Sequence, residues 1–269
     1  MAKRILVIPD VHGRTFWKAP VERYLDSVDR IVFLGDYLDP YGQFVPEDIF
    51  NNLMEIIELK NQNRDKVILL KGNHDQHYSS GLFFELASSS RLDARYWAKY
   101  NKTFEEYKDL FQLIFLEKIK ETPYLFSHAG LTVYWLEKVN SILWKFADGD
   151  FSVADPKIVE MINMLDDTDE GQELLSVVGH NRSRIGKTTG SLLWADVFEH
   201  TTHEAPQVYG LNQVFQVFGH TRLRYNNDMI DAENFAMIDS QQCFMIDEDL
   251  DKRIVTIEEY EEALPGKTI

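Results

Sequence analysis

The sequence predicts an α/β protein built from layers of sheet and helix. Two observations carry this prediction. Short apolar runs rich in β-branched residues, typical of buried strands, alternate with amphipathic helical patterns in the N-terminal part. Each of these runs also ends directly at a group of polar residues of the types that bind metals. Because ligands of layered α/β proteins bind beyond the carboxyl ends of the strands, the same pattern predicts the place of a functional site.

The N-terminal part is expected to contain three strands with two helices between them. The expected strands are Lys3–Pro9, Arg30–Leu34 and Lys66–Leu70. The first helix is expected at Phe16–Ser27, where apolar residues recur at helical spacing. The second is expected at Pro46–Asn61, because a proline followed by two acidic residues makes a favourable first helical turn.

The middle of the chain is expected to hold two helical insertions, at about residues 79–121 and 131–175, separated by a strand at Pro123–Ser127. Within the first insertion, Phe104–Lys120 carries the most regular apolar stripe and is expected to be its main helix. The acidic run Asp166–Glu170 in the second lacks the spacing of a calcium loop, so it is expected to be a solvated loop.

The C-terminal part changes to short apolar runs with turns between them, which predicts a series of antiparallel strands. These are expected at Gln213–Phe218, Asn234–Asp239, Cys243–Asp247 and Lys252–Glu259. No internal repeat and no convincing linker interrupts the sequence. Residues 1–269 are therefore expected to form a single domain.

Composition disfavours nucleic-acid and membrane partners. The chain has 28 Lys and Arg residues against 44 Asp and Glu residues, a net charge of −16 that repels a nucleic-acid backbone. No segment is apolar for long enough to span a bilayer. The single cysteine, Cys243, cannot form an intrachain disulfide, which suits a reducing compartment. We expect a cytoplasmic protein.

Candidate metal ligands occur in five short segments that are spread along the chain. Asp10 and His12 lie two residues apart, so on an extended segment their side chains share a face and can bind one ion. Asp36 offers two oxygens and can bridge two ions. The expected ligands are Asp10, His12 and Asp36 for the first ion, and Asp36, Asn73, His128 and His220 for the second. This mixture of nitrogen and oxygen donors fits Mn, Fe or Zn better than Ca.

The five segments, together with Leu192-Leu193-Trp194-Ala195-Asp196, resemble the calcineurin-like metallophosphoesterases, nearest to their phosphoprotein (serine/threonine) phosphatase branch. The resemblance implies a four-layer αββα sandwich of two mixed sheets flanked by helices. It implies that two divalent ions, about 3.5–4 Å apart, hydrolyse phosphomonoesters of a phosphoprotein or a small metabolite by in-line attack of a metal-bridging hydroxide. It also implies that His74 is the general acid and that Asp39 orients it.

Two departures from that branch bear on the substrate. Asp39 is followed by Pro40-Tyr41-Gly42, so the phosphate-binding arginine of the usual Asp-Arg-Gly motif is missing. Candidate replacements are Arg182, Arg184 and Arg222, since a guanidinium binds phosphate in a bidentate way. Arg222 also stands where many diesterases and nucleases of the superfamily carry a further histidine, which favours monoester chemistry.

Other interpretations remain open. The same site fits a phosphodiesterase, a nuclease or a dinucleoside polyphosphate hydrolase, and the fold also fits a binding scaffold without activity. His180 follows a glycine and rivals His220, but His220 follows the Leu192–Asp196 segment and is favoured. The remaining histidines lack such context and are expected at the surface: His77, His200 and His203.

Overall fold

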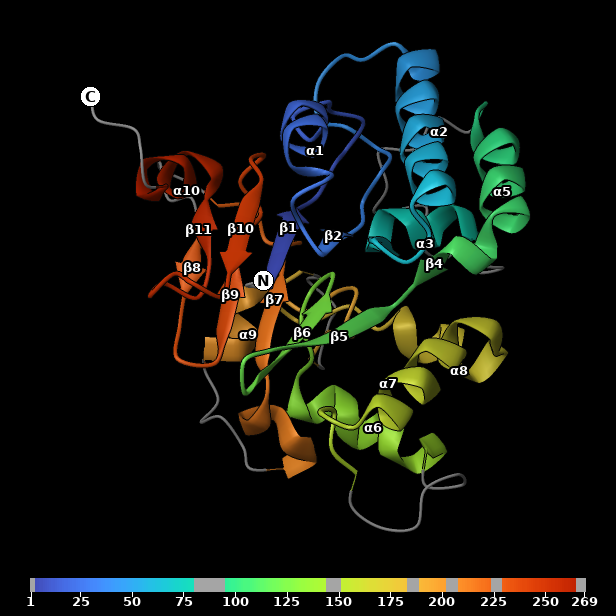
Figure 1. Ribbon diagram of the computed structural model, residues 1–269. Coiled ribbons are helices and arrows are strands. Elements are labelled where there is room, and N and C mark those ends of the chain that lie inside the picture. Colours follow the sequence, from blue (N-terminus) through green and yellow to red (C-terminus); the bar gives the residue numbers. More distant parts are fainter. Residues whose placement is uncertain are drawn as a thin grey trace.

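Two mixed β-sheets form the centre of the molecule, as the resemblance implied (Figure 1). The computed structural model describes residues 3–79, 95–143, 151–182, 189–201, 208–223 and 229–264. Arg184 and His203 lie outside the described residues.

The first sheet has six strands in the order β11-β10-β1-β2-β3-β4. Strands β1 to β4 are parallel, and β10 and β11 run antiparallel to their neighbours. Their bounds are Arg4–Ile8 (β1), Arg30–Phe33 (β2), Val67–Leu70 (β3), Phe111–Gln112 (β4), Phe244–Asp247 (β10) and Val255–Thr256 (β11).

The second sheet has five strands in the order β5-β6-β7-β9-β8. Strands β6, β7 and β9 are parallel, and the edge strands β5 and β8 are antiparallel to their neighbours. Their bounds are Ile114–Ile119 (β5), Thr122–Ser127 (β6), Phe215–Phe218 (β7), Ile230–Asp231 (β8) and Phe235–Met237 (β9).

Helices cover the outer face of each sheet. The first sheet packs against α1 (Lys18–Tyr24), α2 (Pro46–Gln62), α5 (Trp97–Glu106) and α10 (Ile257–Ala263). The second packs against α6 (Val133–Leu143), α7 (Pro156–Asn163) and α8 (Asp169–Leu175). Figure 1 shows these two groups of helices on opposite sides of the molecule. Two further helices are short. Helix α3 (Asn73–Ser79) follows β3, and α9 (Val197–Thr201) follows the Leu192–Asp196 segment.

Alternating side chains on the strands create the layers. In β1, Ile8 packs into the core beneath the first group of helices, whereas Val7 packs into the core between the two sheets. Phe126 of β6 and Val217 of β7 enter that inter-sheet core from the other side. Strands β1, β2 and β3 are parallel in the first sheet, and β6 and β7 are parallel in the second. The polar segments that follow them therefore lie along one edge of each sheet. The four-layer αββα architecture is therefore confirmed.

The expected helix at Phe104–Lys120 is wrong. Helix α5 ends at Glu106, and the rest of the segment forms β4 and β5. Strand β5 pairs with β6 over its whole length, from Ile114 opposite Ser127 to Ile119 opposite Thr122. Hydrogen bonds and packing in this hairpin outweigh the local helical spacing. The region at about 79–121 therefore contributes strands to both sheets and is not a purely helical insertion.

Two further expectations are corrected. The C-terminal strands are not one antiparallel series, because β9 lies parallel to β7 in the second sheet while β10 joins the first. The last expected strand, Lys252–Glu259, keeps only β11 and then becomes helix α10, whose N-terminus Thr256 and Glu259 cap. Within the described segments, no helix has both the length and the apolarity needed to cross a membrane.

The acidic run at Asp166–Glu170 is largely exposed, as expected, but it is not a loop. It spans a 3₁₀ turn, Met164–Asp167, and the start of α8. Asp166 forms an ion pair with Lys71, which is buried directly before the Gly72-Asn73 segment. The second insertion is thereby tied to one of the candidate metal segments.

Candidate metal centre

The six candidate ligands follow five different strands, and all six are buried. Each is at most 9% exposed, although Asp, Asn and His side chains are normally found at the surface. They are Asp10 and His12 after β1, Asp36 after β2, Asn73 after β3, His128 after β6 and His220 after β7. The structure brings them together into two groups that share Asp36.

The first group consists of Asp10, His12 and Asp36, whose ligand atoms all lie within 4.8 Å of one another. His12 Nε2 is 3.5 Å from Asp36 Oδ2. The grouping was expected, but the reason given for it is wrong. His12 is not extended, since its φ is +46°. Instead, the backbone N–H of His12 donates to the carbonyl of Asp36 at 2.6 Å, so pairing between two loops sets the geometry.

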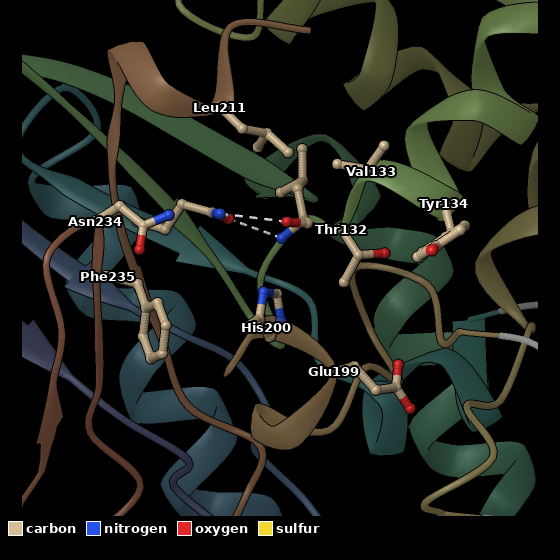
Figure 2. A pocket seen from close by; sticks show the side chains of 10 residues that line it. Thr132, Val133, Tyr134, Glu199, His200, Leu211, Asn234 and Phe235 are labelled. Carbon is tan, nitrogen blue, oxygen red and sulfur yellow. Dashed lines mark hydrogen bonds between the residues drawn. The ribbon is translucent and has the colours of Figure 1, made fainter. Parts of the chain in front are cut away.

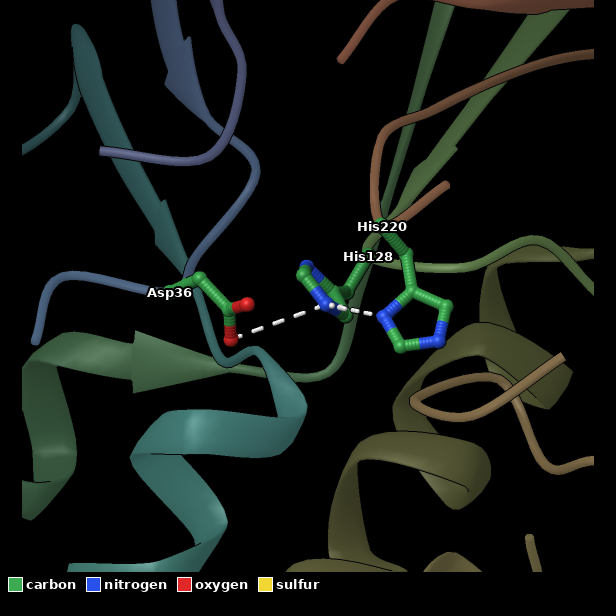
Figure 3. Close-up of side chains that lie close together, drawn as sticks. All are labelled: Asp36, His128 and His220. Atoms are coloured by element: carbon green, nitrogen blue, oxygen red, sulfur yellow. Dashed lines mark hydrogen bonds and ion pairs between the residues drawn. The ribbon is translucent and has the colours of Figure 1, made fainter. Parts of the chain in front are cut away.

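The second group gathers Asp36, Asn73, His128 and His220, and Figure 3 shows three of these side chains converging. His128 Nε2 is the central atom. It lies 3.6 Å from Asp36 Oδ1, 3.0 Å from Asn73 Oδ1 and 3.1 Å from His220 Nδ1. Atoms from three other strand ends therefore lie within 3.6 Å of His128 Nε2.

The protonation of these rings fits a bound cation. His12 Nδ1 and His128 Nδ1 lie 2.8 and 2.9 Å from the carbonyl oxygens of Leu38 and Leu34, which can only accept hydrogen bonds. Both Nδ1 atoms therefore carry the proton, and each Nε2 presents a lone pair to Asp36. Lone pairs that face a carboxylate repel it, and a metal ion between them turns that repulsion into coordination.

Burial strengthens this argument. Burial lowers the pKa of His128 to about 3, and the carbonyl of Leu34 only partly opposes that shift, so the ring is neutral near pH 7. Burial also raises the pKa of Asp36 well above its usual range, and the nearby carboxylates of Asp10 and Asp75 raise it further. Burial and neighbouring carboxylates thus make the negative charge of Asp36 unfavourable. A divalent cation bound between the acids and the neutral imidazoles would stabilise that charge.

Backbone conformations at the site are unusual. His12, Asp36, Asp39 and His220 all have φ between +46° and +67°, the left-handed region that non-glycine residues rarely adopt. Glycines next to the ligands permit close approach. A Cβ atom at Gly219 would overlap the Asp10 carboxylate, and one at Gly72 would overlap that of Asp36.

His74 and Asp39 form a hydrogen-bonded pair beside the first group. His74 Nδ1 lies 2.9 Å from Asp39 Oδ2, and the hydroxyl of Tyr78 donates to the other carboxylate oxygen. Burial opposes ionisation of Asp39, but the hydrogen bonds from His74 and Tyr78, together with the nearby His77 ring, outweigh it and hold the Asp39 pKa below its usual value. The pair is thus an ionised carboxylate that orients an imidazole.

A cleft of about 200 Å³ opens onto both groups. It is lined by His74 and three arginines, Arg14, Arg182 and Arg222, together with the candidate ligands His12, Asp36, Asn73 and His220. Tyr41, Trp194, Asp239 and Gln241 complete the lining. A cleft that is lined by residues of metal-binding types and by arginines fits an anionic substrate.

Comparison with known proteins agrees with this geometry. Residues 3–221 match the calcineurin-like phosphoesterase family. The chain belongs to that family. No curated protein matches it in sequence. The phosphoesterase is therefore a metal-dependent phosphoric ester hydrolase, and its two groups of ligand types suit the two divalent ions typical of the family.

Two solved structures show the same fold at low identity, and a third is similar to a lower degree. A cold-active protein-tyrosine phosphatase of the psychrophile Shewanella sp. superposes with a TM-score of 0.55 and 16% identity, over 91% of this chain and 76% of that chain. Another structure of a cold-active protein tyrosine phosphatase gives 0.50 and 18%, over 91% and 74%. A protein serine/threonine phosphatase from Saccharomyces cerevisiae gives 0.46 and 15%, over 94% and 78%.

The two candidate phosphate-binding arginines within the described residues, Arg182 and Arg222, differ in their surroundings. In the phosphoesterase, Arg182 donates to the carbonyl of His220 and the hydroxyl of Thr221 and pairs with Asp196 at 2.9 Å. Arg222 is exposed, and its guanidinium lies 5.5 Å from the centre of the Tyr41 ring. Arg182 is therefore held by the protein, whereas Arg222 is exposed beside Tyr41 at the cleft.

The other histidines do not all lie where the sequence suggested. His180 is exposed and does not line the cleft, which removes it as a rival to His220. His77 was expected at the surface but is fully buried beside His74 and Asp39. His200 is half-buried, and its Nε2 lies 2.9 Å from the carbonyl of Ala129. The sequence around His77 and His200 carried no signal of burial, because segments distant in the sequence cover these two residues.

Two charged cleft residues, Arg14 and Asp239, were missed by the sequence analysis. Asp239 follows β9 and is 8% exposed, so the rule that found the other ligands, an acid at a strand end, also applied to it. Burial and the charge of Asp10 raise its pKa well above the usual range. Arg14 stands two residues after His12, and only the folding of that loop onto the cleft reveals it.

A second pocket, shown in Figure 2, does not have the character of a reaction site. Its volume is about 30 Å³, and much of its lining is apolar, including Leu131, Leu211 and Phe235. The side chain of Gln216 is already bound to the backbone of Leu131 there. The pocket has room for little more than a water molecule.

Proposed function

We propose that the phosphoesterase hydrolyses phosphate monoesters, on a phosphoprotein or a small phosphorylated metabolite, with two divalent ions of Mn, Fe or Zn. The observation that carries this proposal is the sharing of Asp36 by two buried ligand groups directly beside the His74–Asp39 pair. Asp10, His12 and Asp36 would hold one ion, and Asp36, Asn73, His128 and His220 the other. Bound there, the ions would supply an acidified water as the nucleophile and neutralise charge on the phosphoryl oxygens.

The residues of the chain supply the rest of the chemistry. Because Asp39 accepts from Nδ1 of His74, the Nε2 atom of that ring is left to face the cleft that His74 lines. From there His74 donates a proton to the leaving oxygen of the ester, as a general acid does. The ionised Asp39 favours the protonated imidazole before the transfer. Because water would be the nucleophile, no covalent phospho-enzyme is expected.

The arginines favour a monoester. A phosphate monoester carries nearly two negative charges at pH 7, whereas a diester carries one. Three arginines around one cleft match the more highly charged group. We assign phosphoryl binding to Arg222, because Arg182 is already held by Asp196, Thr221 and the carbonyl of His220.

The test compares Mn²⁺-dependent hydrolysis of para-nitrophenyl phosphate with that of bis-para-nitrophenyl phosphate. The wild type is expected to prefer the monoester, and His74→Ala is expected to lose about 10²–10⁴-fold in kcat while it retains metal. Preference for the diester would instead point to a phosphodiesterase or dinucleoside polyphosphate hydrolase. Full metal occupancy without turnover of either ester would favour a binding scaffold.

A further inference from the structure

His77 lies on α3, three residues after His74, and is completely buried. In the described part of the chain, neither of its ring nitrogens has a hydrogen-bond partner. A buried imidazole without partners is costly, and an apolar side chain fills such a space without that cost. The position is therefore poorly explained by packing alone.

The ring of His77 touches the reactive pair. Its Nδ1 lies 3.7 Å from Asp39 Oδ2, the same oxygen that receives His74 Nδ1 at 2.9 Å. The ligand-type atoms of Asp39, His74 and His77 all lie within 4.8 Å of one another. Three α3 residues, His74, His77 and Tyr78, thus surround a single carboxylate.

His77 also restricts the ring of His74. The two rings meet edge to face with centroids 5.2 Å apart, and His12 meets the His74 ring in the same way, also at 5.2 Å. His77 is itself backed by Trp194, 5.9 Å away, which lines the cleft and contacts the ring of His220 at 6.2 Å. A continuous row of rings therefore runs from one ligand group to the other through His74 and His77.

We propose that His77 is a positioning residue for the general acid, an inference that rests on the proposed phosphomonoesterase function. It acts through Asp39 and His74 and does not touch the substrate. With Tyr78, it keeps the Asp39 carboxylate turned so that Oδ2 receives Nδ1–H of His74 and Nε2 of His74 faces the leaving oxygen. Such support of a reactive group by a neighbouring side chain is worth about 10–100-fold in rate in metal sites.

The test uses His77→Phe, which keeps a buried ring but removes both nitrogens, and His77→Gln, which keeps a polar side chain beside Asp39. Tyr78→Phe removes the other support of Asp39 and provides a second route should His77→Phe fail to fold. His180→Phe is the matched control, because it makes the same change at an exposed position outside the cleft.

Each variant is assayed with phenyl phosphate and para-nitrophenyl phosphate. Phenolate is a poor leaving group that needs a proton, whereas para-nitrophenolate leaves with little help. We expect His77→Phe to lower kcat about 10-fold on phenyl phosphate and about 2-fold or less on para-nitrophenyl phosphate, with KM and metal content unchanged. His77→Gln is expected to recover part of the loss. An equal loss on both esters, or none, would overturn the inference.

A second measurement does not depend on turnover. In ¹⁵N–¹H spectra of the zinc-loaded protein, His74 is expected to show one tautomer, protonated at Nδ1, in the wild type and a mixture in His77→Phe. An unchanged His74 signal in that variant would contradict the positioning role. If the wild type cleaves neither ester, the proposed function fails, and the spectra alone then decide for or against the role of His77.

Discussion

Asp75 holds Asp36 in place. The Asp75 carboxylate accepts the backbone N–H of Asp36 at 2.7 Å, and it also accepts those of Tyr37 at 2.9 Å and Gly72 at 2.8 Å. Asp36 needs this support because its φ of +53° lies in the left-handed region. Asp75 is completely buried. Through these three hydrogen bonds it links the second and third candidate metal segments.

Asp75→Ala is expected to destabilise the metal-free protein by about 3 kcal/mol or more, because three amides lose their acceptor inside the protein. Urea unfolding in the presence of a chelator measures this loss. Asp65→Ala, at an exposed position, serves as the control and should change stability by less than about 0.5 kcal/mol. An equally small effect for Asp75→Ala would show that these three hydrogen bonds do not support the loop.

Asp36→Ala should abolish binding at both ion positions and hydrolysis together, since Asp36 belongs to both ligand groups. Titration calorimetry with Mn²⁺ and elemental analysis give the stoichiometry, which we expect to be two ions in the wild type and none held tightly in the variant. Activity retained by Asp36→Ala would disprove the two-ion mechanism.

Gly219→Ala should weaken metal binding more than stability. Its added Cβ would overlap the Asp10 carboxylate, which must then leave its place in the first ligand group. The backbone at Gly219 is not in the left-handed region, so no conformational strain is added. Gly42→Ala is the contrasting variant: φ is +96° there, but no atom lies within 4 Å of the new Cβ. That change should cost about 1 kcal/mol of stability and leave metal affinity unaltered.

Arg182→Ala and Arg222→Ala should differ in their effects on kcat/KM and on the melting temperature. Loss of Arg222 is expected to lower kcat/KM about 10–100-fold, because a charge-assisted contact with the phosphoryl group disappears, while the melting temperature stays unchanged. Loss of Arg182 breaks its contacts with Asp196, Thr221 and the loop of His220, so it should lower the melting temperature as well. Steady-state kinetics and thermal unfolding of both variants separate the two roles. Identical behaviour would show that the assignment of phosphate binding is wrong.

The pH dependence of stability should reveal the contribution of the Asp247 charge to the fold. Burial raises the pKa of this carboxyl, but hydrogen bonds from the amide of Asp249, from Arg4 and from Tyr260 lower it more, so its pKa lies below the usual value. A carboxyl whose pKa is lower in the folded than in the unfolded state stabilises the fold above the unfolded pKa of about 3.9. This stabilisation disappears as the pH falls through the folded pKa.

Asp247→Asn is therefore expected to cost about 1–2 kcal/mol at pH 7 and progressively less as the pH falls below the unfolded pKa of about 3.9 toward the folded pKa. Urea unfolding of both proteins across this range, with a chelator throughout, measures the difference. A constant difference between pH 7 and pH 3 would show that the charge of Asp247 contributes nothing.

Much of this molecule is predictable from local patterns. The strands β1, β2, β3 and β6 and the helices α1 and α2 follow from short-range periodicity, and their bounds differ from the expected ones by a few residues at most. Phe104–Lys120 shows where this approach fails. Its spacing is compatible with a helix, and only pairing with Thr122–Ser127 makes Ile114–Ile119 a strand.

At the candidate site, the residue types at the strand ends are predictable from local patterns, because a short apolar run followed by Asp, Asn or His is a local feature. How these side chains meet depends on contacts between distant segments. Asp10 and His12 come together through a turn held by the neighbouring Asp36 loop, and His77 is buried by segments far away in the sequence. Periodicity describes neighbours along the chain, whereas burial, tautomers and contacts between loops arise only when both sheets are assembled.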